Sequence, residues 1–198
     1  GSRPNLREAM SLGAGVVLLA LVVRLLPRVL SGDWPATVLA EPIPGLALAF
    51  SAEPLGVLFG LIASFLWIVT TVYSIGYMRG HGEAHQTRFY AFFAIAMGCT
   101  MGVAFADNLF TLFVFYELLT LSTYPLVTHA GTREARQGGR TYLGILMATS
   151  MGFLLLAVVW TWQLTGNVRF TSGGILAGAA SPLVIGILFA LYVFGIGK

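Results

Sequence analysis

The sequence predicts an all-α fold, a polytopic bundle of about six transmembrane helices. Of its 198 residues, 57% are hydrophobic and only 10% are charged, against about 25% charged residues in an ordinary soluble domain. Several uncharged runs reach the length that a helix needs to cross a bilayer. The charged residues gather in the short segments between these runs. These observations exclude an ordinary soluble domain, and the arginines bear on membrane topology rather than on nucleic-acid binding.

The first expected span covers residues 9–30. Arg24 and Arg28 lie near its end, where long basic side chains can reach the interface. A cleavable signal peptide is the alternative, because basic residues precede the apolar run, but no small-residue cleavage site comes before Arg24. Residues 31–53 then contain acidic residues and prolines but no lysine or arginine, which predicts an extramembrane loop.

The remaining spans follow from the other uncharged runs and from aromatic residues at the expected headgroup depth. Tyr73 and Tyr77 lie at the end of one run, and Trp160 and Trp162 near the end of another. Together these signals predict spans over residues 54–78, 89–106, 108–129, 141–164 and 181–198.

The arginines in the short connections set the expected orientation, because cytoplasmic loops carry an excess of basic residues. With six spans, most arginines fall on the side of the N-terminus, which is therefore expected to be cytoplasmic. The final apolar run ends without a cap or stop signal, so the chain is expected to be one transmembrane domain truncated at both ends. The arginines on the expected cytoplasmic side are Arg3, Arg7, Arg79 and Arg88, followed by Arg133, Arg136 and Arg140 in a segment interpreted as a basic loop.

Glu117 is the single formal charge between Asp107 and Arg133, about halfway along an apolar helix. A carboxylate at membrane mid-depth costs about 2.5–3.5 kcal/mol on insertion scales, and a partner or water usually offsets that cost. Glu117 is therefore a candidate residue for proton or ion translocation. The alternative is a structural carboxylate that accepts hydrogen bonds from hydroxyl groups of a neighbouring helix.

A stripe of polar residues runs from Glu117 toward the end of its helix. At about 100° per residue, Thr120, Tyr124 and Thr128 lie on the same face as Glu117, and His129 follows them. These four residues are candidates for a supporting polar track. Histidine can relay protons near neutral pH, although an interfacial histidine at a helix end is the simpler interpretation of His129.

Lys198 is the second candidate translocation residue. Gly195 and Gly197 precede it, and glycines lower helix propensity enough to allow a kink or a break. Freed backbone groups at such a break can line an ion pathway. If Lys198 meets Glu117, each charge offsets the desolvation of the other, and a proton arriving on either group switches the pair. The alternative is that Lys198 marks the end of a span.

Other polar residues give weaker hypotheses. His81, Glu83 and His85 share one connection, but no further ligand cluster supports a metal site. The sequence has no nucleophile triad and no nucleotide-binding fingerprint. No catalytic residue, metal or cofactor is therefore expected, and the chain is expected to be a transport subunit rather than an enzyme.

Five short segments occur in the order seen in antiporter-like membrane subunits, and the chain resembles that family. The family joins the large subunits of Mrp-type Na⁺/H⁺ antiporters to the proton-pumping subunits of respiratory complex I. The most specific segment surrounds Glu117, and its continuation to His129 is most similar to the D-type antiporter subunit. The five segments are Tyr73–Met78, Arg88–Tyr90, Ala106–Leu109, Phe115–Tyr124 and Phe194–Lys198.

The resemblance implies a fold of about fourteen helices built on inverted repeats, of which this chain would be the N-terminal fragment. It implies that Glu117 is the family's ion-paired glutamate and Lys198 its partner lysine on a broken helix. The implied function is proton translocation in a multisubunit cation antiporter, coupled to Na⁺. The implied partners are other membrane subunits, H⁺, Na⁺ and the lipid of a prokaryotic inner or plasma membrane, without nucleic acid.

Three alternatives remain open at this point. The first is a proton-pumping subunit of complex I or of a related hydrogenase complex, which would share the site. The second is a scaffold subunit that packs against partners without moving ions. The third is a membrane enzyme, such as a quinone-binding one, which would need a polar pocket and a nearby redox cofactor.

Overall fold

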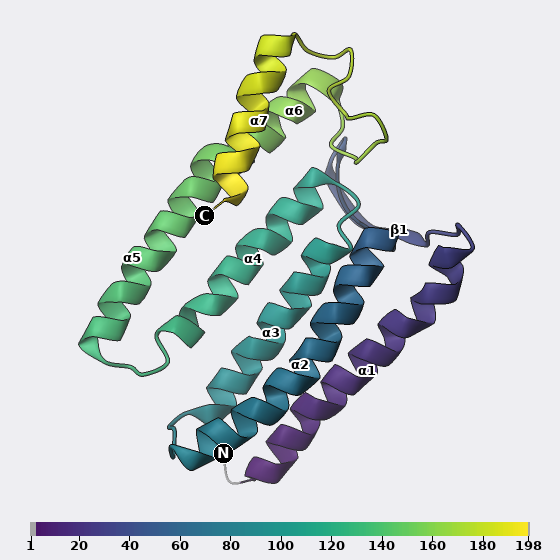
Figure 1. The fold of residues 1–198 in the computed structure, drawn as a ribbon. Coiled ribbons are helices and arrows are strands. Elements are labelled where there is room, and N and C mark those ends of the chain that lie inside the picture. The colour runs from purple at the N-terminus through teal and green to yellow at the C-terminus, as the bar shows by residue number, and fades with distance from the viewer. Residues whose placement is uncertain (1–2, 198) are drawn as a thin grey trace.

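The computed structural model describes residues 3–197, which fold into a row of long helices with a β-hairpin at one end (Figure 1). Helix α1 (Pro4–Leu30) comes first, followed by the strands β1 (Ala36–Ile43) and β2 (Leu46–Ser51). The other elements are α2 (Pro54–Gly80), α3 (Gln86–Ala104), α4 (Leu109–Val127), α5 (Arg133–Thr149), the π-helical segment η1 (Ser150–Leu155), α6 (Leu156–Thr165) and α7 (Pro182–Ile196).

Within residues 3–197, five helices are long and apolar enough to cross a membrane. Four of them are α1 to α4, and the fifth runs from α5 through η1 to α6. Helix α7 is apolar but has only 15 residues, which is short for a span. The predicted multi-span helical fold is confirmed, with five full-length helices and one shorter helix where six spans were expected.

The helices pack largely in chain order, α1 on α2, α2 on α3 and α3 on α4, whereas α7 packs on η1 and α6 (Figure 1). Two glycines allow close contacts between helices, Gly56 between α2 and α3 and Gly102 between α3 and α4. A Cβ atom at Gly56 would lie 2.3 Å from the carbonyl oxygen of Ala104, and one at Gly102 would lie 2.0 Å from the ring of Phe115. A side chain at Gly56 would meet backbone and separate α2 from α3, whereas one at Gly102 would displace the Phe115 ring.

Helix α1 begins five residues before the predicted span because a buried carboxylate fixes its first turns. Glu8 is 5% exposed, and its carboxylate pairs with Arg7 at 3.2 Å and also with Arg79 at the end of α2. Arg7 also contacts α3, because its guanidinium donates a hydrogen bond to the Gln86 side chain at 2.6 Å. This charged cluster thus holds α1, α2 and α3 together at the end of the bundle where the N-terminus lies.

The basic segment 131–140 is not the loop that the sequence analysis expected. Most of it forms the first turns of α5. The fifth span therefore begins earlier than expected, at the end of the bundle where the N-terminus lies. Thr132 caps this helix, because its hydroxyl accepts a hydrogen bond from the Ala135 backbone N–H at 3.1 Å. Glu134 lies in the first turn, where the helix dipole favours a negative charge.

Residues 31–53 contain a β-hairpin that the sequence analysis treated only as a loop. Strand β1 pairs antiparallel with β2, with Ala36 opposite Ser51. Gly45 forms the turn with a φ of +81°, a conformation that glycine adopts without strain. Two isolated bridges, Phe50 with Ala106 and Asn108 with Arg169, extend this sheet toward the α3–α4 and α6–α7 connections. The hairpin therefore ties both connections together at this end.

Candidate functional site

Helix α4 carries Glu117 at its centre. The helix begins after Asn108, whose side-chain oxygen accepts a hydrogen bond from the Thr111 backbone N–H at 2.8 Å. Glu117 is 6% exposed, so its carboxylate is removed from both lipid and bulk water. A buried carboxylate in an apolar helix is the feature that the sequence analysis singled out, and the structure places it inside the bundle.

The C-terminal end of α7 lies next to this part of α4. The Tyr116 hydroxyl, one residue before Glu117, donates a hydrogen bond to the Ile196 carbonyl at 2.7 Å. Lys198, the predicted partner of Glu117, lies outside the described residues. The hydrogen bond nevertheless fixes the last turn of α7 against the middle of α4. Sequence reasoning missed Tyr116, because only the tertiary structure brings residues this far apart in the chain into contact.

The π-helical segment η1 supports the end of α7. A Cβ atom at Gly195 would lie 2.5 Å from the Leu154 backbone nitrogen, so α7 and η1 touch along their backbones. Nearby, the Thr161 and Tyr192 hydroxyls share a hydrogen bond of 2.8 Å between α6 and α7. Single-turn π segments occur often at functional sites. The predicted span over 141–164 gave no signal for this one.

The predicted polar stripe continues along α4 from Glu117. Thr120 is 5% exposed, and its hydroxyl donates to the Tyr116 carbonyl at 3.0 Å. Further along the helix, the Thr128 hydroxyl donates to the Tyr124 carbonyl at 2.9 Å. Pro125 interrupts the backbone hydrogen bonds in the same region, because proline has no N–H to donate. The stripe therefore combines buried and half-buried hydroxyls with a locally weakened helix.

His129 lies where this stripe reaches the end of the bundle at which the N-terminus lies. Both of its ring nitrogens are buried, without a hydrogen-bond partner among residues 3–197. The Arg88 guanidinium donates to the His129 carbonyl at 3.0 Å, and the Phe89 ring packs edge-on against the imidazole. A cavity of about 520 Å³ opens here, lined by Glu83, Ala84, His85, Arg88, Tyr124, Thr128, His129, Ala130, Gly131 and Arg136. The structure thus brings three of the predicted track residues to one polar cavity.

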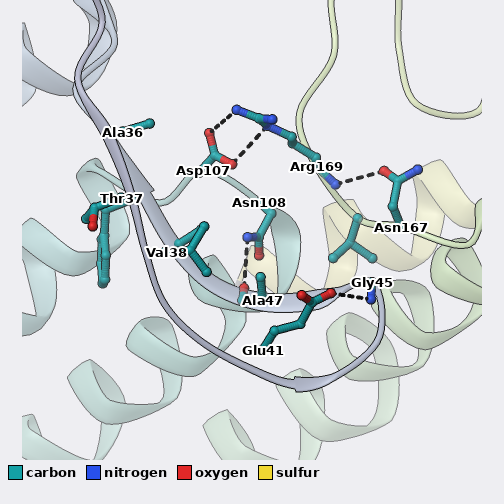
Figure 2. A pocket seen from close by; sticks show the side chains of 13 residues that line it. Ala36, Thr37, Val38, Glu41, Gly45, Ala47, Asp107, Asn108, Asn167 and Arg169 are labelled. Atoms are coloured by element: carbon teal, nitrogen blue, oxygen red, sulfur yellow. Dashed lines mark hydrogen bonds and ion pairs between the residues drawn. The ribbon is translucent and has the colours of Figure 1, made fainter.

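A second polar cavity, of about 300 Å³, lies at the opposite end of α4 under the β-hairpin (Figure 2). Asp107 and Arg169 form an ion pair of 3.0 Å at its edge. The Asn108 side chain donates to the Ala47 carbonyl at 2.9 Å. The Glu41 carboxylate accepts from the Gly45 backbone N–H at 2.8 Å. These polar groups are bonded within the protein, and the sequence analysis did not select them.

A protein-family model described as "NADH:quinone oxidoreductase/Mrp antiporter, TM" matches residues 106–197, just under half of the chain. NADH-quinone oxidoreductase subunit N of Desulforudis audaxviator is 29% identical over 99% of this chain and 39% of its own length. Na⁺/H⁺ antiporter subunit A1 of Staphylococcus aureus is 28% identical over 61% of this chain and 15% of its own length. The chain therefore spans less than half the length of these curated relatives.

Solved structures show the same fold. One is a chain of the membrane-bound sulfane sulfur reductase, an archaeal respiratory membrane complex, with a TM-score of 0.76 and 19% sequence identity. The match covers 97% of the chain described here and 40% of the reductase chain. A chain of the Mrp complex from Dietzia sp. matches 98% with a TM-score of 0.73 at 21% identity and is covered over 36%. Fold, family model and relatives agree with the sequence resemblance: this chain is similar to antiporter-like membrane subunits of the type shared by Mrp antiporters and complex I.

Proposed function

We propose that this chain is the proton-translocating part of a subunit in a multisubunit cation/H⁺ antiporter, and that Glu117 and Lys198 form its charge switch. One observation carries the proposal. Glu117 is buried at the centre of a membrane-spanning helix, and the neighbouring Tyr116 binds the last turn of α7, two residues before Lys198. A carboxylate in this position needs a compensating group, and the proposal assigns that role to the ammonium of Lys198, which follows α7 in the sequence.

The switch follows from elementary electrostatics. When both groups are ionised, their attraction offsets the desolvation of each charge. A proton that binds the carboxylate removes this attraction, so the ammonium loses its counter-charge and its own proton becomes easier to release. A proton entering at Glu117 would therefore drive a proton off Lys198 toward the remainder of the longer protein.

The polar stripe offers the proton a route to Glu117. The cavity at His129 is lined by Tyr124 and Thr128, and Thr120 lies between them and the carboxylate. Hydroxyl groups can accept one proton while they donate another. The imidazole nitrogens have no hydrogen-bond partner among residues 3–197, and the imidazole lines the cavity, so the proposal makes His129 the first proton carrier of the path. These properties support a proton path that begins at His129 and ends at Glu117.

A proton-pumping subunit of a complex I-like enzyme is the second candidate function. It is favoured by the relative named subunit N, which aligns with 99% of this chain, whereas subunit A1 aligns with 61%. The two functions would use the same Glu117 and Lys198 switch and differ in what drives it. Assignment to the D-type antiporter subunit is part of the first proposal and rests on the wording of residues 115–129.

The test is Glu117→Gln in the full-length protein, with antiport measured as ΔpH-linked exchange in membrane vesicles supplied with Na⁺, Li⁺ and K⁺ in turn. Exchange is expected to be abolished while the complex still assembles. Glu53→Gln is the matched control, because Glu53 is exposed at the start of α2 and should leave exchange unchanged. Near-normal exchange by Glu117→Gln would leave only a scaffold role. Iron–sulfur or flavin subunits that co-purify would favour the complex I-like candidate.

A further inference from the structure

Three exposed arginines form one face of the first turns of α5. Arg133, Arg136 and Arg140 follow the spacing i, i+3, i+7, so their side chains leave the helix on the same side. Together with Gln137 they line a surface cavity of about 580 Å³. We call these three residues the α5 arginine face. None of the three side chains is a proton carrier in the proposed path, although Arg136 also lines the cavity at His129.

No acidic side chain among residues 3–197 neutralises this face. Neither Arg133 nor Arg140 takes part in an ion pair there. Arg136 donates two hydrogen bonds to the Gly131 carbonyl, at 3.0 and 2.8 Å, which holds its guanidinium beside the cavity. Like charges one helical turn apart repel, and the positive end of the helix dipole adds to this repulsion. A bound anion would relieve both effects.

Membrane topology alone does not account for this arrangement. Basic residues set orientation by their number on one side of the membrane, and a flexible loop would serve that purpose equally well. Here the three arginines are instead fixed in a capped helix and aligned on one face. Such alignment matters for a ligand that several guanidinium groups bind at once.

The position of the face along the helix indicates its ligand. Uncharged residues begin at Thr141, directly after Arg140, and continue into the membrane-spanning part of the helix. From Arg133 to Arg140 the helix rises about 10 Å, enough to extend from the edge of the apolar segment across a headgroup layer of about 5–8 Å. Guanidinium groups match phosphate oxygens in bidentate geometry. We propose that the α5 arginine face binds the phosphate of an anionic phospholipid, such as phosphatidylglycerol, at this surface of the membrane.

Lipid binding tests the proposal without measuring transport, so its outcome is independent of the proposed proton switch. The full-length protein is titrated with phosphatidylglycerol in phosphatidylcholine nanodiscs, and bound lipid is counted by native mass spectrometry. Each arginine is expected to contribute about fivefold to affinity, so the triple variant with glutamine at all three positions should bind on the order of 100-fold more weakly. Arg3→Gln is the matched control, because Arg3 is exposed, lies outside the face and should leave binding unchanged.

Three results would overturn the proposal. The first is equal binding of phosphatidylglycerol by the wild type and the triple variant. The second is equal binding of phosphatidylglycerol and phosphatidylcholine by the wild type. The third is displacement of the lipid by millimolar inorganic phosphate, which would indicate a site for free anions. If the triple variant does not fold, Arg133→Gln and Arg140→Gln are tested singly, and an unchanged affinity in both would equally refute the assignment.

Discussion

The substitution Gly195→Ala is predicted to push the end of α7 away from η1. The new Cβ atom would lie 2.5 Å from the Leu154 backbone nitrogen and 2.8 Å from its Cα atom. Backbone atoms cannot rotate aside as a flexible side chain can. The two helices must therefore separate by on the order of 1 Å to restore ordinary van der Waals contact.

Two opposing terms set the size of the effect. Overpacking of this kind costs about 1–3 kcal/mol, whereas alanine favours a helix over glycine by about 1 kcal/mol. The free energy of unfolding should thus fall by up to about 2 kcal/mol. A displacement of about 1 Å would also move Ile196 relative to Tyr116, and misplacement on this scale can reduce a rate by as much as about 100-fold.

Thermal unfolding and vesicle exchange of the full-length protein measure both consequences. Gly186→Ala is the matched control, because Gly186 lies on the same helix and a Cβ atom added there would meet no neighbouring atom within 4 Å. The control should be as stable as the wild type or slightly more stable, with unchanged exchange. If Gly195→Ala matches Gly186→Ala in both assays, the close contact between α7 and η1 is not as described.

Two further substitutions test the contacts around α4. Tyr116→Phe removes the hydrogen bond to the Ile196 carbonyl. It should lower the free energy of unfolding by about 1 kcal/mol and reduce exchange. Denaturant titration and the vesicle assay measure these two effects, and wild-type values in both would contradict the prediction. Arg169→Gln removes the ion pair with Asp107, whose side chain is 11% exposed while that of Arg169 is 66% exposed. Because the pair is half in solvent, thermal unfolding should show a loss of at most about 1 kcal/mol, and a larger loss would mean that the pair is more deeply buried than the structure indicates.

The uncharged runs predicted the spans well because hydropathy is a local property of the chain. The runs after Glu53 and Arg88 became α2 and α3, each beginning within a few residues of the expected start. The start of α5 differs from the expected span because the charged residues 133–140, which by hydropathy indicate a loop, form helical turns. The signal was present in Thr132 and Glu134, which are typical of a helix N-terminus.

Other features depend on tertiary structure and could not be predicted in the same way. The π-helical segment η1 packs closely against Gly195, and no local pattern marks it. The hairpin did leave a signal, because Pro44 and Gly45 separate two apolar runs, but this was outweighed by the acidic and proline-rich composition of the segment. At the site, the position of Glu117 near the centre of its helix was predictable from spacing, whereas the bond from Tyr116 to Ile196 was not.

A double-mutant cycle on Glu117 and Lys198 tests the proposed switch most directly. Exchange is measured in vesicles for the full-length wild type, for Glu117→Gln, for Lys198→Gln and for the variant with both substitutions. If the two groups act as one pair, each single substitution should abolish most exchange and the second should add little to the first. Losses that simply multiply, or a Lys198→Gln variant that transports normally, would contradict the account.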